Sequence, residues 1–199
     1  ISQYAFENCS RLTNITVSEN NKNYSSSDDG KILFNKDKTA LIAYLNVTDD
    51  VIIPEGVTSI DTYVFKDCSS ITIPASVTSI PFNQCDNNLK NVYISDLAAW
   101  CNIDFGAKEY HGPISYDYNL YLNGNLITDL VIPEGVTSIG YSVFSGCSSL
   151  TSITIPDSVT FVSRASFPSN SNLYNEYDNG LYLGNSNNPY LIFMGVKDN

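Results

Sequence analysis

The sequence predicts a repeat solenoid built mainly of short β-strands, and three observations support this. The stretch IPEGVTSI occurs twice without change, at Ile53 to Ile60 and at Ile132 to Ile139. Each copy is followed by a related stretch with the same Ile-Pro spacing and an apolar residue three positions after the valine, ITIPASVTSI and then ITIPDSVTFV. Three further segments alternate apolar and polar residues around turn-forming residues. Repetition of this kind is typical of one structural unit stacked several times.

Each unit combines a strand, a proline stop and a turn. An ITI stretch sends its two isoleucines inward and its threonine outward, and the proline ends the strand because it has no N–H for the ladder. The spacing is 20 residues from Pro54 to Pro74 and 23 from Pro133 to Pro156. Both values fall within the window of about 20–29 residues that is typical of leucine-rich repeats. We therefore expect short parallel strands in the coils, with turns or short helices on the convex side.

Weaker copies of the unit bring the expected number of coils to about five. They lie at Cys9 to Asn20 and at Cys85 to Ser95, where apolar residues keep the spacing of the stronger copies. We expect residues 1–199 to form a single solenoid. Because the sequence begins at Ile1, part-way through a repeat, we also expect the chain to be a fragment of a longer protein.

Three insertions are predicted to form β-hairpins, near residues 30–44, 118–127 and 179–196. The second contains Asn123-Gly124 between alternating hydrophobic residues, which is the strongest short-range hairpin signal. The other two use longer turns rich in Asn, Gly, Asp or Pro. The first two lead into the two IPEGVTSI coils, and we expect a further coil to follow the third.

A short helix is predicted within Ser95 to Gly106, where Ser-Asp precedes Leu-Ala-Ala-Trp as a helix cap. Trp100 is a candidate for a binding surface. A single Trp on a short helix is more often packed against a neighbouring element, and we favour that interpretation.

The repeat stretches resemble the BspA-like leucine-rich repeats of bacterial cell-surface proteins, which are also abundant in some parasitic protists. The resemblance rests on Ile-Pro, Val-x-x-Ile and Phe-x-x-Cys, as in VIIPEGVTSIDTYVFKDCSS, and covers nearly the whole chain. The sequence departs from the pattern at Pro81 to Cys85, where PFNQC replaces the usual turn, and at a three-residue deletion after Ser70. The resemblance implies an exported protein associated with adhesion, host matrix binding or coaggregation, and it brings no set of functional residues.

Composition excludes several classes of partner. The chain has 10 Lys and Arg against 21 Asp and Glu, a formal charge of −11, which repels phosphate backbones and anionic lipids. Nucleic acid is therefore not an expected partner. No run of apolar residues is long enough to span a membrane, so membrane insertion of this segment is not expected either. Five cysteines without a C-x-x-C pair argue against a disulfide framework, and we expect them to pack as small hydrophobic residues.

Catalytic and metal-binding signals are weak. The single histidine, His111, lies in KEYHGP without a readable nucleophile beside it, so a solvated loop is the favoured interpretation. The acidic stretch SSDDGK, Ser26 to Lys31, lacks the carboxylate spacing of a calcium loop and is interpreted as a turn. No nucleotide-binding or hydrolase motif occurs. We therefore expect no enzymatic activity, no cofactor and no metal.

The outward-facing strand residues are the candidate binding site, because solenoids use the exposed face of their stacked strands to bind partners. By the expected register these residues are Thr16, Ile52, Thr72, Tyr93, Val131 and Thr154. The alternative is that β-branched residues at these positions simply stack well in a ladder.

The predicted function is that of a non-enzymatic protein-binding or adhesion module at the cell surface or secreted, with host matrix or another cell's surface among the expected partners. One alternative is carbohydrate binding, since Tyr is abundant (14 residues) and several loops are rich in Asn. Another alternative is a structural spacer that carries a different domain.

Overall fold

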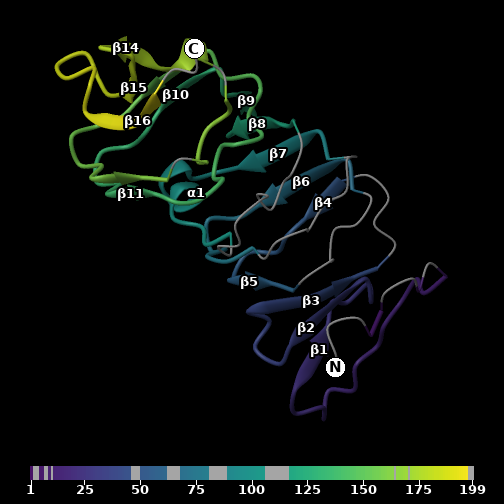
Figure 1. Ribbon diagram of the computed structural model, residues 1–199. Coiled ribbons are helices and arrows are strands. Elements are labelled where there is room, and N and C mark those ends of the chain that lie inside the picture. Colours follow the sequence, from purple (N-terminus) through teal and green to yellow (C-terminus); the bar gives the residue numbers. More distant parts are fainter. Residues whose placement is uncertain are drawn as a thin grey trace.

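In the computed structural model, the chain forms a mainly-β solenoid of about four turns with almost no helix. An antiparallel meander lies at one end of the elongated stack and a second three-stranded sheet at the other (Figure 1). The structure describes residues 1, 5–6, 9, 11–45, 50–61, 68–80, 89–105, 117–163, 165–169 and 171–196. The departure at Pro81 to Cys85 lies outside these residues, as does His111.

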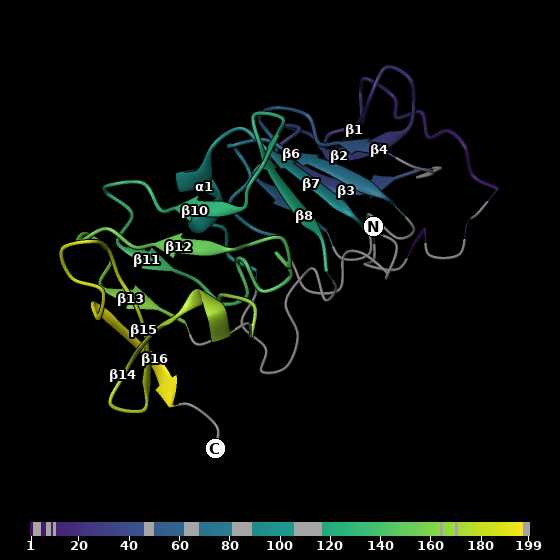
Figure 2. The same cartoon turned by 90° about the horizontal axis from the view of Figure 1, so that it is seen from above.

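The first strand of each coil builds the main parallel sheets. One sheet has the order β4-β6-β7-β8-β9, in which the first four strands are parallel and β9 (Asn125–Leu126) is antiparallel. Figure 2 shows β6, β7 and β8 side by side. A second, two-stranded sheet pairs β10 with β12 in parallel. Inward residues such as Val51, Val92 and Leu120 are almost fully buried, as the alternation predicts. The bounds are β4 (Asp50–Ile52), β6 (Ser70–Ile73), β7 (Asn91–Ile94), β8 (Asn119–Leu122), β10 (Asp129–Val131) and β12 (Ser152–Thr154).

A second ladder follows each proline turn. It contains β5 (Ser59–Ile60), β11 (Ser138–Ile139) and β13 (Phe161–Val162), with β11 and β13 paired in parallel. The predicted turns are present, and short strands that the sequence did not predict follow them. The side chain of Thr78 donates a hydrogen bond to the carbonyl oxygen of Thr58 in the preceding coil (3.2 Å), and its backbone N–H reaches the same oxygen (2.9 Å). β-Branched residues favour this extended geometry over a helix.

Antiparallel strands occupy the three inserted segments. The first contains β2 (Ile32–Asn35) and β3 (Ala40–Tyr44), and β3 also pairs in parallel with β5. The second contains β9 (Asn125–Leu126), paired with β8. The third contains β15 (Gly180–Leu183) and β16 (Ile192–Val196). The first and third each gain one strand that the sequence did not predict, β1 (Tyr24–Ser26) and β14 (Asn175–Tyr177).

The predicted short helix is present as α1 (Leu97–Cys101). The Asp96 carboxylate accepts a hydrogen bond from the backbone N–H of Ala99 at 2.9 Å, which satisfies one of the first N–H groups of the helix. Trp100 is only 1% exposed, and its Nε1 donates to the carbonyl oxygen of Val143 at 3.1 Å. The packed interpretation of Trp100 is therefore confirmed. A 3-10 turn, η1 (Ser171–Leu173), is the other helical element of the described residues.

Thr16 does not lie in a coil strand, contrary to the prediction. Residues 12–17 contain no strand, although their sequence follows the repeat. The backbone N–H of Ile15 instead donates to the carbonyl oxygen of Gly30 (2.8 Å), and that of Val17 donates to the Ser26 hydroxyl (3.3 Å). This segment therefore bonds to the antiparallel meander that follows it.

One continuous apolar core runs through the stack, from Ile32 to Met194. Phe144 and Phe167 stack inside it with ring centroids 5.4 Å apart. The cysteines behave largely as predicted: Cys68, Cys101 and Cys147 are buried thiols in this core, but Cys9 is exposed. Cys85 lies outside the described residues.

Candidate functional site

The outward side of the β4-β6-β7-β8-β9 sheet carries one row of aligned side chains. The register pairs Ile52 with Thr72, Thr72 with Tyr93, and Tyr93 with Tyr121. Tyr121 is in turn paired with Leu126 in the antiparallel strand β9. Since directly paired residues lie about 5 Å apart and share a face, these side chains form a continuous strip. We call it the outward row: Ile52, Thr72, Tyr93, Tyr121 and Leu126.

The outward row is apolar at its ends and aromatic in the middle. Ile52 is 64% exposed and Leu126 is 43% exposed. Tyr93 and Tyr121 stack on each other, with ring centroids 4.8 Å apart and planes 23° apart. A shorter piece of the same kind lies on the β10-β12 sheet, where Val131, 61% exposed, pairs with Thr154. Five of the six predicted site residues therefore lie on these strips. Thr16 is exposed but is not part of either strip.

A polar row runs beside the outward row, two residues earlier on each strand. It aligns Asp50, Ser70, Asn91 and Asn119. The Ser70 hydroxyl donates to the Asp50 carboxylate, and the Asn119 amide donates to the Asn91 side-chain oxygen at 3.3 Å. On the β10-β12 sheet the Ser152 hydroxyl likewise donates to Asp129 at 2.6 Å. The two rows together give an amphipathic face whose polar side chains already bond across the coils.

Sequence reasoning did not include Tyr121 or Leu126, because both belong to a segment assigned to a hairpin insertion. The pairing of Tyr121 with Tyr93 depends on where the chain rejoins the sheet after residues 106–116. The NLYL stretch of β8 repeats the alternation of the NVYI stretch of β7. That similarity is the signal that would have found Tyr121.

Two of the buried cysteines, Cys101 and Cys147, are protonated at neutral pH and are therefore poor nucleophiles. Burial raises the pKa of Cys147 to about 12. Burial also raises the pKa of Cys101 to about 12, with a smaller contribution from the nearby Asp96 carboxylate. Because the thiolate is the nucleophile, we interpret both residues as packing groups.

The acidic stretch at Asp28-Asp29 forms a turn, as predicted. The Ser27 hydroxyl and the backbone N–H of Lys31 both donate to the Asp29 carboxylate, and these bonds lower its pKa. Gly30 takes a φ of 68°, which a glycine adopts without steric cost. Within the described parts of the chain, no group of three or more His, Cys, Asp or Glu is placed to hold a metal ion.

A depression lies beside α1. It leaves no room for a water molecule, and we do not consider it a small-molecule site. Its lining residues are Ile73, Pro74, Ala75, Ile94, Asp96, Ala99, Trp100 and Ile103.

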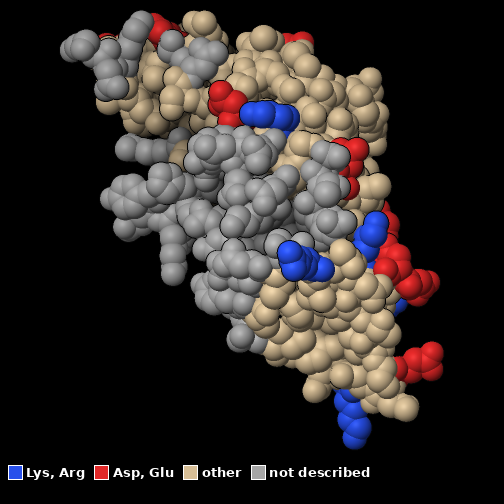
Figure 3. Space-filling view, turned by 90° about the vertical axis from the view of Figure 1, so that its right-hand side faces the viewer, with Lys and Arg blue, Asp and Glu red and all other residues tan. Residues whose placement is uncertain are grey.

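Charged side chains are sparse on the face shown in Figure 3, where carboxylates lie mainly along one edge and most of the coloured surface carries no charge. Asp, Glu, Lys and Arg make up only 16% of the chain.

Comparison with known families assigns the repeat. The model of the BspA-type leucine-rich repeat region matches in six copies, over residues 1–28, 42–102 and 115–177. The match covers more than half of the chain. The chain belongs to the BspA-type leucine-rich repeat family. The outward row lies entirely within the BspA-type copies, as do Val131 and Thr154.

Solved structures with similar folds are bacterial leucine-rich repeat proteins. One, from Eubacterium ventriosum, is 22% identical over 90% of this chain and 57% of its own length, with a TM-score of 0.48. Another, a leucine-rich cell surface protein from Faecalibacterium prausnitzii, is 22% identical over 85% of this chain and 60% of its own, with a TM-score of 0.44. The BspA-type chain therefore spans less than two thirds of either structure.

Two further findings concern the BspA-type chain. A search of curated proteins finds no match. Among the described residues, no helix is both long enough and apolar enough to cross a bilayer.

Proposed function

We propose that this chain is a non-enzymatic protein-binding module that acts at the cell surface or after secretion. The observation that carries the proposal is the outward row, in which exposed apolar side chains flank a stacked tyrosine pair on one rigid sheet. Contiguous exposed apolar surface tends to mark an interaction site, and aromatic side chains are enriched at the centre of protein interfaces. The BspA-type repeat is compatible with this use of the face.

The amphipathic character of the face favours a protein partner over a glycan. The polar row beside the outward row already uses donors and acceptors in bonds between coils, which leaves fewer of them for sugar hydroxyls. The Tyr93 and Tyr121 rings also cover part of each other's faces, and a sugar stacks on an open ring face. An extended or flat protein surface fits the strip better.

Charged substitutions on the outward row and on the shorter β10-β12 strip test this function. Ile52→Glu, Tyr93→Glu and Val131→Glu are expected to reduce capture of the partner by at least about tenfold, because a partner would have to bury an unpaired charge. The measurement is binding of purified wild-type and variant chain to a panel of purified extracellular matrix proteins. Ile52 and Val131 are more than 60% exposed, so their substitutions are expected to leave the melting temperature nearly unchanged.

The matched control is Phe161→Glu, which adds the same charge at a position that is 59% exposed on the other ladder. It should bind like wild type. A glycan array tests the carbohydrate alternative, in which sugars and not matrix proteins are retained. If no matrix protein is retained, or if the outward-row variants bind as well as wild type, the proposed function is wrong and a spacer role is favoured.

A further inference from the structure

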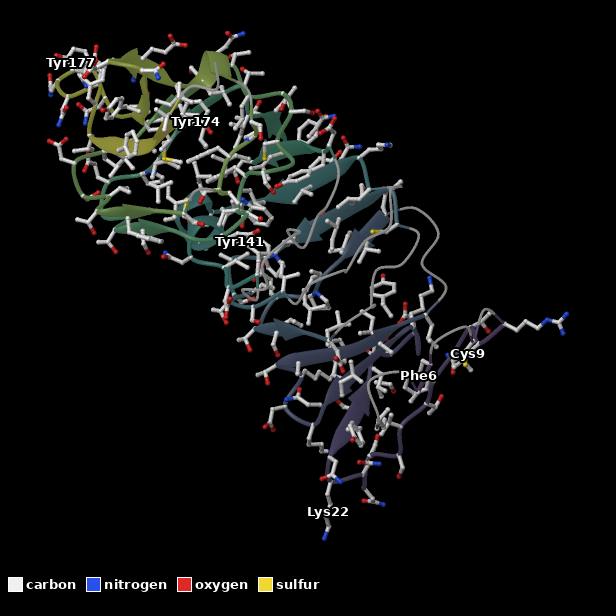
Figure 4. The ribbon with its side chains drawn as sticks, in the orientation of Figure 1. Phe6, Cys9, Lys22, Tyr141, Tyr174 and Tyr177 are labelled. Atoms are coloured by element: carbon white, nitrogen blue, oxygen red, sulfur yellow. The ribbon has the colours of Figure 1, made fainter. Side chains whose placement is uncertain are left out.

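Four aromatic rings form a connected cluster on the C-terminal sheet, away from the outward row. Tyr177 lies on β14, Tyr182 on β15 and Phe193 on β16, and Tyr190 lies in the loop between β15 and β16. The Tyr190 ring centroid lies 5.2 Å from that of Tyr177 and 5.5 Å from that of Tyr182. Tyr182 is also 5.4 Å from Phe193. We call these four residues the aromatic cluster. Figure 4 places Tyr177 at the end of the molecule opposite Lys22.

The cluster occupies the side of the sheet that faces away from the core. On the inner side, Leu183 and Met194 are buried, and Leu181 packs against the same core. On the outer side, Tyr177 is 61% exposed and Phe193 is 53% exposed. The core is therefore closed without these rings. A connected group of exposed rings is typical of a binding site.

The ring geometry suits a small cation better than a flat ligand. The ring planes of Tyr182 and Tyr190 are 78° apart, and those of Tyr182 and Phe193 are 59° apart. The rings therefore do not form one flat platform on which a sugar or a base would stack. The rings instead pack against one another at an angle, and the exposed ring faces of Tyr177 and Phe193 can attract a positive charge through their quadrupoles.

The absence of a side chain at Gly180 leaves room for the Tyr182 ring to lie against the backbone. A Cβ built on Gly180 would lie only 2.6 Å from Cε2 of Tyr182, so the Tyr182 ring lies directly over the backbone at this position. In the turn before Gly180, Asp178 and Asn179 both have positive φ, 46° and 63°. This is the pattern of a type I′ hairpin turn, and it joins Tyr177 to Gly180 in direct register.

Charge in this part of the chain also favours a cation. Residues 171–196 contain Glu176 and Asp178 and no Lys or Arg. Asp178 directly follows Tyr177, in the turn at one end of the cluster. The chain as a whole carries −11. A positively charged ligand is therefore attracted both by the nearby carboxylate and by the field of the whole molecule.

We propose that the aromatic cluster binds Lys or Arg side chains of a basic segment in a partner protein. The proposal rests on the contacts among three tyrosines and one phenylalanine, the exposure of Tyr177, Tyr190 and Phe193, and the local excess of negative charge. It concerns a different surface from the outward row, so either surface can fail its test without affecting the other.

The probe is a hexalysine peptide with blocked ends, titrated into the purified chain at low ionic strength by isothermal calorimetry. Tyr177→Leu and Tyr190→Leu each remove a ring, and each is expected to weaken binding by about two- to fivefold, as for exposed cation–π contacts. Tyr177→Phe and Tyr190→Phe keep the ring and should bind nearly as well as wild type. Tyr93→Leu, which removes a ring from the outward row, is the matched control and should bind like wild type.

Two further measurements distinguish hexalysine binding at the aromatic cluster from general attraction of a basic peptide to an acidic protein. The same peptide with all its lysines acetylated should not bind, because acetylation removes the charge and keeps the chain length. Asp178→Asn should weaken binding at low salt without changing the rings, and it tests the site independently if a Leu variant fails to fold.

The proposal is overturned if the Leu variants bind hexalysine as wild type does, or if the acetylated peptide binds equally well. It is also overturned if sedimentation shows that the cluster joins two copies of the chain, or if a glycan array is bound through the cluster while the peptide is not.

Discussion

The carbonyl oxygen of Val143 links three separate parts of the chain through single side chains. Trp100 from α1 donates its Nε1–H to this oxygen at 3.1 Å, and Tyr118 at the start of β8 donates its hydroxyl at 3.3 Å. Trp100 and Tyr118 are 1% and 3% exposed. Burying a carbonyl without a donor is costly, so these two residues act together even though 18 positions separate their numbers.

Because Trp100 and Tyr118 share one acceptor, we expect their substitutions to lower the free energy of unfolding non-additively. Tyr118→Phe removes one donor with little change of shape and should cost about 1 kcal/mol. Trp100→Phe removes the other donor and leaves a gap, so about 2–3 kcal/mol is expected. The double variant removes both donors, and it should cost about 1 kcal/mol more than the sum of the single variants. Urea unfolding of the four proteins measures this coupling. Additivity within about 0.3 kcal/mol would show that the shared carbonyl is not what connects the two residues.

At the scale of the element, the proline turns explain why IPEGVTSI is repeated without change. In both copies the glycine has a φ of 87°, and the backbone N–H of Val57 donates to the carbonyl oxygen of Pro54 at 3.3 Å. This is a type II turn, which requires a residue with positive φ at its third position. The N–H of Gly56 then donates to the Ser76 hydroxyl of the next coil at 3.1 Å. Gly135 and Ser158 repeat the contact at 3.2 Å. The repeating object is therefore a glycine coil followed by a serine coil.

Gly56→Ala isolates the conformational part of this turn. A Cβ at Gly56 meets no atom within 4 Å, so the expected cost of about 1 kcal/mol comes only from the positive φ. Gly195→Ala is the matched control, because its Cβ also meets nothing within 4 Å and its φ is not in the left-handed range. Chemical denaturation should show a loss for Gly56→Ala and no loss for Gly195→Ala. Equal effects would indicate that the turn can adopt another type without cost.

The sequence could predict those elements whose signals are local. The Asn123-Gly124 turn, the Asp96 cap and the Ile-Pro strand ends each depend on a few neighbouring residues, and the structure has all three. Strand β14 carries the polar sequence NEY, whose residues are all exposed, so no apolar alternation marked it. The aromatic cluster could not be predicted for the same reason. Its rings meet only through the register of β14 with β15 and β16, which the sequence does not encode locally.

At the scale of the whole molecule, packing and hydrogen bonds connect the β4-β6-β7-β8-β9 sheet to the β10-β12 sheet. The β4-β6-β7-β8-β9 sheet and the β10-β12 sheet are separate in their strand pairing. The bonds from Trp100 and Tyr118 to Val143 cross this break, and the backbone N–H of Tyr118 donates to the carbonyl oxygen of Gly146 at 2.8 Å. The apolar core is continuous through the same region. These contacts predict that the two sheets unfold together, as in a solenoid whose coils are strongly coupled to their neighbours.

The buried thiols provide a direct test of this coupling. Cys68 and Cys101 belong to the coils of the first sheet, and Cys147 lies beyond the break. A buried thiol reacts only after an opening that exposes it, and the pKa of about 12 at Cys101 and Cys147 makes both inert in the folded state at neutral pH. Labelling with a thiol reagent, followed by peptide mass spectrometry, gives a free energy of opening for each site. We expect the three values to agree within about 0.5 kcal/mol, while exposed Cys9 reacts at once. A markedly lower value on one side of the break would show that the two sheets open separately and that residues 1–199 do not unfold as one unit.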